Sequence, residues 1–348
     1  MEWYDNHQRK LPWRSENPDP YRIWLSEIIL QQTKIAQGTS YYLRFVDAYP
    51  DVHALANASE DEILKNWQGL GYYSRARNLH ATAKYISKEL HGRFPSEYNE
   101  IIKLKGVGEY TAAAISSIAF GLPHAVVDGN VYRVLARVFG ISTETDSTVG
   151  KKEFKILAQS LLAEARPADY NQAVMEFGAL QCVPGKPDCS VCPLQEICVA
   201  FHEDKVSSYP VKRKKVKQKS RFFHYLVIEQ GNRIYLKKRA EKDIWRNLYD
   251  FPLVETKKLL DQSRLMKMLE KSGLLKGVES IGPPTACKPH ILSHQKIYAS
   301  FTKIKVSGDT EVLWPHAFPV KKSTLANYAV PKLLENYLVN ESDLLHLL

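Results

Sequence analysis

The sequence predicts two domains, a mainly helical N-terminal domain and an α+β C-terminal domain. Residues 21–205 show apolar side chains at helical spacing, punctuated by Gly and Pro turns. A run of Lys and Arg within residues 206–220 interrupts this pattern, and strand-like segments follow it. At 348 residues the chain suits two domains that each bury a core. We therefore expect domains at residues 1–205 and 221–348, joined by an exposed basic linker at 206–220.

Each expected element follows from a local pattern. Helical periodicity in the first domain covers residues 23–35, 61–67, 75–90, 109–120, 130–140 and 151–165. In the second domain, residues 221–229 and 233–239 flank a "QGN" turn and predict a β-hairpin. A helix is expected around residues 257–271 and a further strand at 296–306.

The overall charge indicates an anionic partner. Lys and Arg number 48 against 38 Asp and Glu, a net charge of +10 with a pI near 9.1. Nucleic acid is the first candidate and an anionic membrane surface the second. The N-terminus lacks the layout of a signal peptide, and the most apolar long stretch, residues 111–127, is broken by Ser, Gly, Pro and His. We expect a soluble, cytoplasmic protein.

Glu27 stands in the apolar stripe of the first of these helices. It lies four residues after Ile23 and three after Trp24, where a helix that packs on a core would carry an apolar residue. One explanation is a buried glutamate that is paired with an arginine or with a backbone group. The other is a carboxyl that desolvation keeps protonated at neutral pH, as a general acid requires.

The segment "LKGVGEYTAAAIS" places two glycines in a tight turn between helical segments. Gly106 and Gly108 let the backbone approach a phosphate, with amide groups and the next helix N-terminus directed at it. An ordinary turn between two helices is the alternative. In a basic protein this turn could hold a DNA backbone without reading its sequence.

Asp128 is a second carboxylate that precedes a helix. Asp followed by Gly and Asn before an apolar run is typical of an N-cap. A helix N-terminus stabilises an ionised carboxylate, so we expect Asp128 to be charged where Glu27 stays protonated. Two carboxyls whose pKa values are pushed apart can supply the acid and the charge stabiliser for glycosidic bond cleavage.

Four of the five cysteines form a cluster with the spacing C-x6-C-x2-C-x5-C. These are Cys182, Cys189, Cys192 and Cys198. In a chain with no secretory signal, such clustering indicates a metal site rather than disulfides. The ligation rules leave zinc and an iron–sulfur cluster both open. The fifth, Cys287, is interpreted as an inert core thiol.

These motifs, in this order and spacing, resemble the helix-hairpin-helix DNA glycosylases that include endonuclease III. Within that superfamily "LPWR", "SEIILQQT", "GLGYYSRARN" and "NQAVMEFGA" are similar to the adenine glycosylase branch, the MutY family. The resemblance covers nearly the whole chain. It implies a [4Fe-4S] cluster on the four cysteines and a Nudix-like C-terminal domain. It also implies excision of adenine opposite 8-oxoguanine or guanine in double-stranded DNA, by a monomer at the nucleoid of a bacterium.

The resemblance also assigns roles to residues. It implies that Glu27 protonates adenine N7 and later activates water, that Asp128 stabilises or traps the oxocarbenium ion, and that Tyr110 and Asn130 support the site. Further matches fall into two groups: the pocket around an extruded adenine contains Trp13, Arg14 and Gln172, and the DNA-binding positions near the lesion are Gln32, Thr33 and Tyr72. Extrusion of the base is required for chemistry on it. Core aromatics are the alternative for Trp13 and Tyr72.

Tyr110 also bears on the type of reaction. Members of the superfamily that cleave the DNA strand carry a lysine at this position, two residues after the second hairpin glycine, and that lysine forms a Schiff base with the sugar. A phenol cannot form this imine. The sequence therefore predicts a monofunctional glycosylase with little or no strand cleavage.

The C-terminal domain is expected to recognise the lesion rather than to hydrolyse nucleotides. No glutamate-rich Nudix box follows "IWRNLYDFPLVE". In the family a Phe-Ser-His segment contacts 8-oxoguanine, and here "ILSHQK" supplies Ser293 and His294 with Leu292 in place of Phe. An ordinary polar turn at a strand edge is the alternative.

Two other functions stay open at the level of sequence. One is a non-catalytic nucleic-acid-binding protein with zinc or an Fe–S cluster, in which Glu27 is a buried ion and Asp128 a helix cap. The other is a glycosylase/lyase for oxidised pyrimidines, which Tyr110 and the additional domain disfavour.

Overall fold

The computed structural model describes residues 1–162, 166–213, 218–273, 277–308 and 310–340. The chain divides into two compact units, one of Met1–Ala58 with Arg77–Lys214 and the other of Ser59–Ala76 with Lys215–Leu348. Residues 59–76, which we expected within the first domain, thus group with the C-terminal residues. The fold class otherwise follows the expectation: the first unit is helical, and the second combines a sheet with helices.

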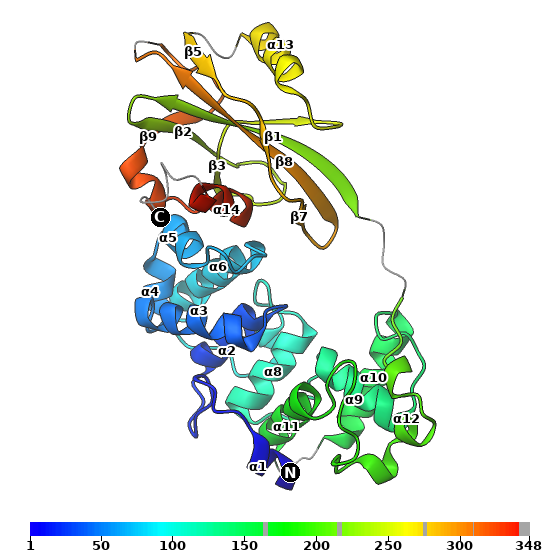
Figure 1. Cartoon of the computed structure of the whole chain (residues 1–348). Coiled ribbons are helices and arrows are strands. Elements are labelled where there is room, and N and C mark those ends of the chain that lie inside the picture. The colour runs from blue at the N-terminus through cyan, green and yellow to red at the C-terminus, as the bar shows by residue number, and fades with distance from the viewer. Residues whose placement is uncertain (163–165, 214–217, 274–276, 309, 341–348) are drawn as a thin grey trace. The chain divides into compact units, whose positions relative to one another are not determined.

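The first unit consists of helices joined by loops of different lengths (Figure 1). In chain order they are α1 (Glu2–His7), α2 (Pro20–Leu30), α3 (Ile35–Ala48), α4 (Val52–Asn57), α6 (Ser74–Glu89), α7 (Tyr98–Ile101), α8 (Glu109–Phe120), α9 (Gly129–Phe139), α10 (Thr148–Leu161), α11 (Pro167–Leu180) and α12 (Val199–His202), with 3₁₀ turns at Gln195–Ile197 and Val206–Ser208. The first residues of α6 belong to the second unit.

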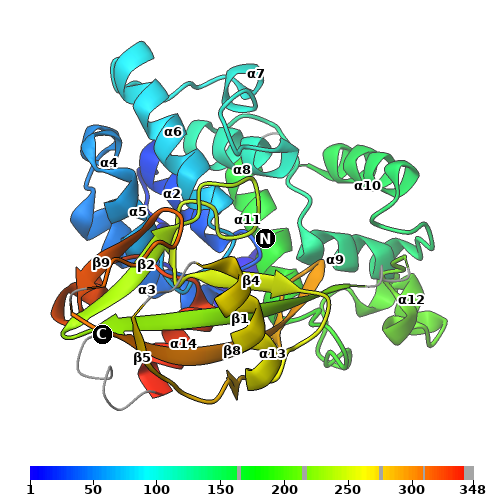
Figure 2. The ribbon, with the colours of Figure 1, turned by 90° about the horizontal axis from the view of Figure 1, so that it is seen from above.

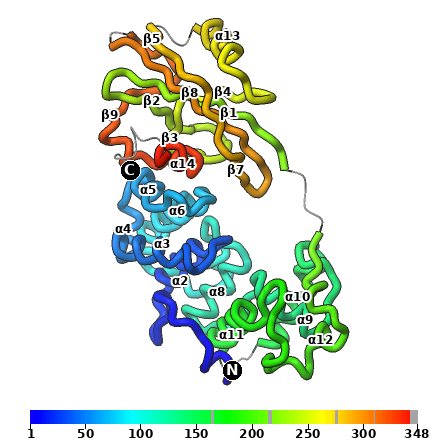
Figure 3. The backbone as a smooth tube through the Cα atoms, viewed as in Figure 1, coloured from blue at the N-terminus to red at the C-terminus, as the bar shows by residue number. Residues whose placement is uncertain are grey.

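Three helices of the first unit bring the expected catalytic residues into one region. α2 packs on α8, and α11 packs on both α8 and α9. The tube in Figure 3 shows α8 and α11 next to each other. Large side chains that are fully buried, among them Trp24 and Ile29 of α2, fix these helices. Glu27, Tyr110 and Asp128 therefore sit on α2, on α8 and at the start of α9.

The second unit is built on one mixed sheet with the strand order β3-β2-β1-β8-β5. Its elements are α5 (Glu60–Asn66), β1 (Lys219–Gln230), β2 (Arg233–Lys238), β3 (Tyr249–Asp250), β4 (Leu253–Thr256), α13 (Gln262–Ser272), β5 (Val278–Ile281), β6 (Thr285–Ala286), β7 (His290–Ile291), β8 (Gln295–Val306), β9 (Ala317–Lys321), a 3₁₀ turn at Lys322–Asn327 and α14 (Lys332–Asn340). The hairpin expected at residues 221–239 is present as β1 and β2, with Gln230 opposite Arg233.

Strands β1 and β8 form the centre of this sheet. They pair in parallel from Lys219 opposite Gln295 to Glu229 opposite Lys305, and Figure 2 shows them side by side. Side chains alternate between the two faces. On one face Phe223, Tyr225 and Val227 pack with α14, and on the other Leu226 and Ile228 pack with α13. Figure 1 shows these two helices on opposite sides of the strands.

Part of the expected basic linker is ordered against the first unit. Thr145 donates a backbone hydrogen bond of 3.0 Å to Val211, and Arg213 forms an ion pair of 2.8 Å with Glu144. Residues 214–217 lie outside the described residues, and β1 begins at Lys219. Among the described helices, none is long and apolar enough to cross a membrane.

Candidate active site and cysteine loop

Glu27 lies on the buried side of α2. The helix starts at Pro20, with Asp19 as its N-cap accepting a hydrogen bond from the Tyr21 amide at 2.9 Å. Burial, together with the charge of Asp128, raises the pKa of Glu27 to about 7, although a hydrogen bond from Tyr110 opposes the rise. A carboxyl with this pKa is partly protonated at neutral pH, so Glu27 can donate a proton.

Tyr110 is in the first turn of α8 and contacts this carboxyl. Burial and the charges of Glu27 and Asp128 raise its pKa well above the usual value, so the phenol keeps its proton. Its hydroxyl is 3.9 Å from the Met175 sulfur. Because the hydroxyl donates to Glu27, it favours the charged form of that carboxyl against burial. Tyr110, a residue that the resemblance placed at this site, therefore lies next to Glu27.

Asp128 is the N-cap of α9. One carboxylate oxygen accepts from the amides of Asn130 at 2.9 Å and Val131 at 2.8 Å, and the other accepts from the Asn130 side chain at 2.8 Å. Burial raises the pKa of Asp128, and these hydrogen bonds and the charge of Arg133 oppose the rise. We expected the pKa values of Glu27 and Asp128 to be pushed apart. Burial instead raises both pKa values, and the charged form of Asp128 accepts more hydrogen bonds than that of Glu27.

Asn130 is held in turn by Arg133, which donates to its side-chain oxygen at 2.9 Å. The same guanidinium donates to the carbonyls of Cys182, at 2.7 Å, and Gly178. Arg133 is 8% exposed. It therefore connects the cap of α9 to the start of the cysteine loop, which the sequence did not indicate because the partners are 45 or more residues away.

A cavity of about 460 Å³ brings together Trp13, Arg14 and Gln172, the three residues expected around an extruded base. Ile23 of α2 and Ile118 of α8 also line it. Trp13 is 9% exposed and packs edge-on against Tyr42 at 5.2 Å between ring centroids. Trp13 thus belongs to the core and to the cavity wall at once.

Arg14 is already engaged by an ion pair. Its guanidinium lies 2.9 Å from Glu176, which Arg9 also contacts at 2.6 Å. Burial alone would raise the pKa of Glu176, but the hydrogen bonds from Arg9 and Arg14 lower it to about 2. Arg14 therefore lines the cavity wall and neutralises a buried carboxylate.

The hairpin glycines lie in the turn that leads into α8. Gly106 has φ of 84°, and a Cβ atom there would lie 2.7 Å from the Asn78 side chain. Gly108 is the N-cap residue of α8 and is exposed. The first amides of α8 have no intrahelical acceptor. They are available to an anion at this turn.

Gln32 and Thr33 follow α2 directly. Gln32 is exposed and has φ of 54°, a left-handed conformation that is uncommon for a residue other than glycine. Thr33 continues this turn, with its amide donating to Leu30 at 3.0 Å. The turn presents the Gln32 side chain to solvent.

In the second unit, Tyr72 and Ser293 are in direct contact. Their hydroxyls are 2.6 Å apart. Tyr72 is 47% exposed and has φ of 48°, and Ser293 and His294 form the exposed tip of the β7–β8 hairpin. Leu292 packs against the apolar core of the sheet, where it anchors the hairpin. The structure thus brings together two residues that the sequence placed 221 positions apart.

The four clustered cysteines line one cavity, together with Arg137. The Arg137 guanidinium is 3.3 Å from the Cys182 sulfur and 2.9 Å from the Val183 carbonyl. Within the part of the chain that the structure describes, no three His, Cys, Asp or Glu side chains are placed to hold a single metal ion. Cys287 packs against the core of the second unit, which agrees with an inert thiol.

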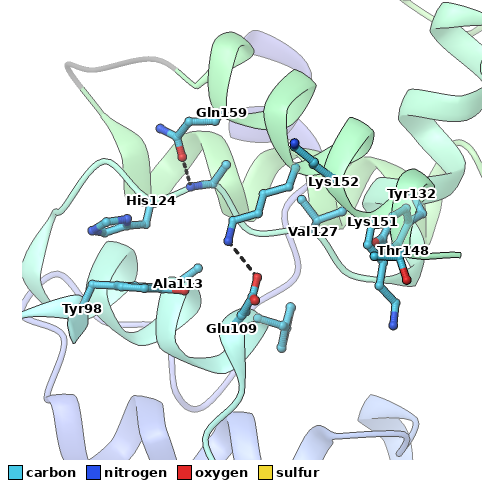
Figure 4. Close-up of a pocket in the computed structure, with 13 residues that line it drawn as sticks. Tyr98, Glu109, Ala113, His124, Val127, Tyr132, Thr148, Lys151, Lys152 and Gln159 are labelled. Atoms are coloured by element: carbon cyan, nitrogen blue, oxygen red, sulfur yellow. Dashed lines mark hydrogen bonds and ion pairs between the residues drawn. The ribbon is translucent and has the colours of Figure 1, made fainter. Parts of the chain in front are cut away.

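A further cavity, of about 830 Å³, was not expected from the sequence (Figure 4). It lies between α8 and α10 and includes Tyr110 in its wall. Three lysines of α10 line it, and Lys155 pairs with Glu109 at 2.7 Å. The only sequence pattern that could have indicated this cavity is "KKEFK", which is equally typical of the solvent-exposed face of a helix.

Two family models match the chain. Residues 25–159 match the HhH-GPD superfamily of base excision DNA repair proteins, and residues 224–340 match the NUDIX domain. Among solved structures, a thermostable thymine-DNA glycosylase has 32% sequence identity and a TM-score of 0.54 over 58% of this chain and 93% of that chain. An endonuclease III–DNA complex, with 23% identity and a TM-score of 0.51, shows the shared fold. The expected fold class is thus confirmed.

Two Buchnera relatives are similar over more of the chain than these structures. Adenine DNA glycosylase of Buchnera aphidicola subsp. Acyrthosiphon pisum is 37% identical over 74% of this chain and 73% of its own length. The enzyme of the Baizongia pistaciae subspecies is 33% identical over 90% of this chain and 89% of its own length. The human enzyme is 45% identical over 58% of this chain and 38% of its own length. The chain therefore belongs to the adenine DNA glycosylase family.

Proposed function

We propose that this protein excises adenine that stands opposite 8-oxoguanine or guanine in double-stranded DNA. The observation that carries the proposal is the Glu27 carboxyl, whose pKa of about 7 lets it hold a proton beside the ionisable Asp128. An acid and a neighbouring carboxylate are what cleavage of an N-glycosidic bond requires, because positive charge develops on the sugar as the base leaves.

The reaction uses these groups in order. Glu27 gives its proton to N7 of adenine, and the bond from C1′ to N9 breaks with its electron pair going to the base. Asp128 stabilises the oxocarbenium ion, and Asn130 fixes the orientation of the Asp128 carboxylate. A water molecule then adds to C1′ and gives a proton to Glu27. The products are free adenine and an abasic site.

The cavity beside α2 is the proposed site for the extruded base. Trp13 offers an apolar wall and Gln172 an amide that can pair with the edge of adenine. Gln32 and Tyr72, each exposed and in a left-handed backbone conformation, are proposed to contact the base stack near the lesion. Thr33 and the amides at Gly106 and Gly108 would hold the DNA backbone.

Strand cleavage is not part of the proposed activity. Tyr110 occupies the position at which a lysine would form a Schiff base, and its raised pKa keeps the phenol neutral. The enzyme should therefore release adenine and leave the abasic strand intact until alkali or heat breaks it.

Ser293 and His294 are the proposed contacts to 8-oxoguanine. The two guanines differ at O8 and at the N7 proton, and a hydroxyl can serve either as donor or as acceptor. Tyr72 orients the Ser293 hydroxyl through the bond of 2.6 Å. One polar contact of this kind is worth on the order of 1–3 kcal/mol of discrimination.

We further propose that Cys182, Cys189, Cys192 and Cys198 hold a [4Fe-4S] cluster. Their position around one cavity, with the buried cation Arg137 at 3.3 Å from Cys182, suits a group that several thiolates ligate together. When bound, the cluster would stabilise the fold of residues 182–198 rather than take part in base removal. The enzyme is proposed to act as a monomer on chromosomal DNA.

The test is single-turnover cleavage of duplexes with adenine opposite 8-oxoguanine or guanine, followed by separate assays for free adenine and for strand breaks before alkali. The proposal expects adenine release without direct breaks, and replacement of Ser293 and His294 by Ala should slow excision opposite 8-oxoguanine toward the rate opposite guanine. Binding without release would instead support a non-catalytic DNA-binding protein. Release of oxidised pyrimidines with strand breaks would support a glycosylase/lyase.

A further inference from the structure

The cavity between α8 and α10 carries a strong positive charge. Lys151, Lys152 and Lys155 line it against a single carboxylate, Glu109. Burial and the charge of Lys155 lower the pKa of His124, which stacks on Tyr98 with ring centroids 4.5 Å apart and closes one side. Figure 4 shows Lys151 and Lys152, which belong to the same helix as Thr148. The charge of the cavity therefore comes from α10.

The position of these lysines on α10 is unfavourable for the helix alone. Lys151 and Lys152 lie near its N-terminal end, at Thr148, where the helix macrodipole already places positive charge. Cations stabilise a helix at its other end, so the placement is not explained by the stability of α10. An anion bound at this end would be attracted both by the lysines and by the helix terminus.

The negative charge of Glu109 disfavours an anion in the same region unless that charge is neutralised. It is the first residue of α8, directly after the hairpin residue Gly108, where the free amides point. Lys155 pairs with it at 2.7 Å, and the two side chains are 57% and 68% exposed. An exposed ion pair of this kind contributes about 0–1 kcal/mol. Because this contribution is small, we infer that the ion pair serves mainly to neutralise the Glu109 charge at the hairpin.

We propose that this cavity binds the phosphodiester backbone of DNA next to the hairpin, with Lys151 and Lys152 as phosphate-binding residues and Lys155 as the residue that cancels the charge of Glu109. The inference rests on the proposed action on double-stranded DNA and adds a second backbone site to the hairpin amides. Lys151 and Lys152 bind directly, whereas Lys155 is a positioning residue that acts through Glu109.

The first experiment compares two double variants of the full-length protein. Lys151→Ala with Lys152→Ala should weaken binding of any duplex by about tenfold and lower the slope of log affinity against log salt by about 2, since each phosphate contact contributes roughly 0.9. The control is Lys84→Ala with Lys88→Ala, which removes the same charge from exposed positions of α6. Equal losses in the two double variants would overturn the site.

The second experiment is a double-mutant cycle on the ion pair. Lys155→Ala should weaken DNA binding several-fold because it leaves Glu109 charged at the hairpin. The Glu109→Gln variant should bind DNA at least as well as the unaltered protein. The double variant, Lys155→Ala with Glu109→Gln, should recover most of the affinity that Lys155→Ala alone loses. If Lys155→Ala weakens DNA binding by the same factor in the unaltered protein and in the Glu109→Gln variant, charge cancellation is contradicted.

A third measurement separates DNA from free phosphate as the ligand. Inorganic phosphate at constant ionic strength should raise the melting temperature of the unaltered protein more than that of the Lys151/Lys152 variant. If phosphate stabilises the protein and the variant binds DNA normally, the cavity takes a free anion and the proposal is wrong. If the unaltered protein excises no adenine but the variants show the expected losses of DNA binding, the result counts against the proposed function and not against this phosphate site.

Discussion

At the scale of single residues, burial of Glu27 changes the pKa of its carboxyl. Desolvation disfavours its charged form more strongly than the Tyr110 hydroxyl favours it, and the result is a pKa of about 7 in place of 4.5. The sequence indicated an unusual carboxyl from its place in the apolar stripe of α2. The sequence could not supply the contact with Tyr110, because that contact depends on the packing of α8 on α2.

The first prediction is the pH dependence of excision. In the proposed mechanism protonated Glu27 is the acid, so the single-turnover rate should fall by about tenfold per pH unit above roughly pH 7. Glu27→Gln should lose excision and keep binding of the lesion duplex. Excision by this variant within tenfold of the original would refute the acid role.

The same shift predicts that the protein loses stability at high pH. Since the folded pKa of about 7 exceeds the ordinary value of 4.5, the folded state binds more protons between these values, and the free energy of unfolding falls as pH rises through this range. The Glu27→Gln variant has no carboxyl to ionise at this position. At pH 8 its free energy of unfolding should therefore exceed that of the original protein by at most about 3 kcal/mol. Thermal unfolding at pH 5 and pH 8 measures the difference.

Asp128 combines a cap and a charge, and substitution can separate the two. Asp128→Asn keeps an oxygen for the amides of Asn130 and Val131, so stability should change by less than about 1 kcal/mol. Loss of the negative charge should slow excision by at least about a hundredfold. Asp261→Asn, at the N-cap of α13, is the matched control and should leave excision unchanged. Surviving activity with a lower melting temperature would make Asp128 a structural cap.

At the scale of elements, α5 is attached to the sheet of the second unit. Asp61 accepts hydrogen bonds from Lys238 at 2.6 Å and Tyr249 at 2.9 Å, and Asn247 donates to Glu60. The turn after α5 carries Tyr72, whose hydroxyl meets Ser293. The helix therefore positions the turn relative to the β7–β8 hairpin.

Breaking this attachment should reduce lesion discrimination. Asp61→Ala removes the acceptor for two donors on β2 and β3, so the Tyr72 turn should shift and orient Ser293 less well. We expect the ratio of excision rates opposite 8-oxoguanine and guanine to fall several-fold, in the same direction as loss of Ser293 and His294. Asp47→Ala, an exposed position of α3, serves as control. An unchanged ratio would mean that α5 does not position the hairpin.

The cysteine loop gives a prediction about metal content. Protein purified without oxygen should be brown, with about four irons per chain, since zinc is colourless. Cys198→Ala should lose iron and visible absorbance, whereas Cys287→Ala, with its thiol in the core of the second unit, should keep both. Zinc as the sole metal would contradict the cluster.

At the scale of the whole molecule, the net charge of +10 predicts strong dependence on salt. Duplex affinity should fall by about a hundredfold or more between roughly 50 and 200 mM salt, because several separate phosphate contacts release counterions together. Titrations of a lesion duplex and of an undamaged duplex should give similar slopes. A flat response would argue against backbone contacts as the main source of affinity.

Local patterns predicted the helices and the β1–β2 hairpin, whereas contacts between distant residues were not predictable. Helical periodicity located α2, α8 and α9, and the "QGN" turn located the hairpin. The parallel pairing of β1 with β8 joins residues 76 positions apart, as His224 and Ser300 show, and no local pattern encodes it. The grouping of residues 59–76 with the second unit depends on contacts such as that of Asp61 with Lys238, which lies 177 residues away.

This grouping affects how the protein can be rebuilt from parts. A chimera that takes residues 218–348 from a relative would join a foreign β2 and β7–β8 hairpin to the original α5 and Tyr72 turn. Partners such as Asp61 with Lys238 would then come from different parents. The exchangeable module is consequently discontinuous in sequence, and grafts should carry residues 59–76 together with the C-terminal segment.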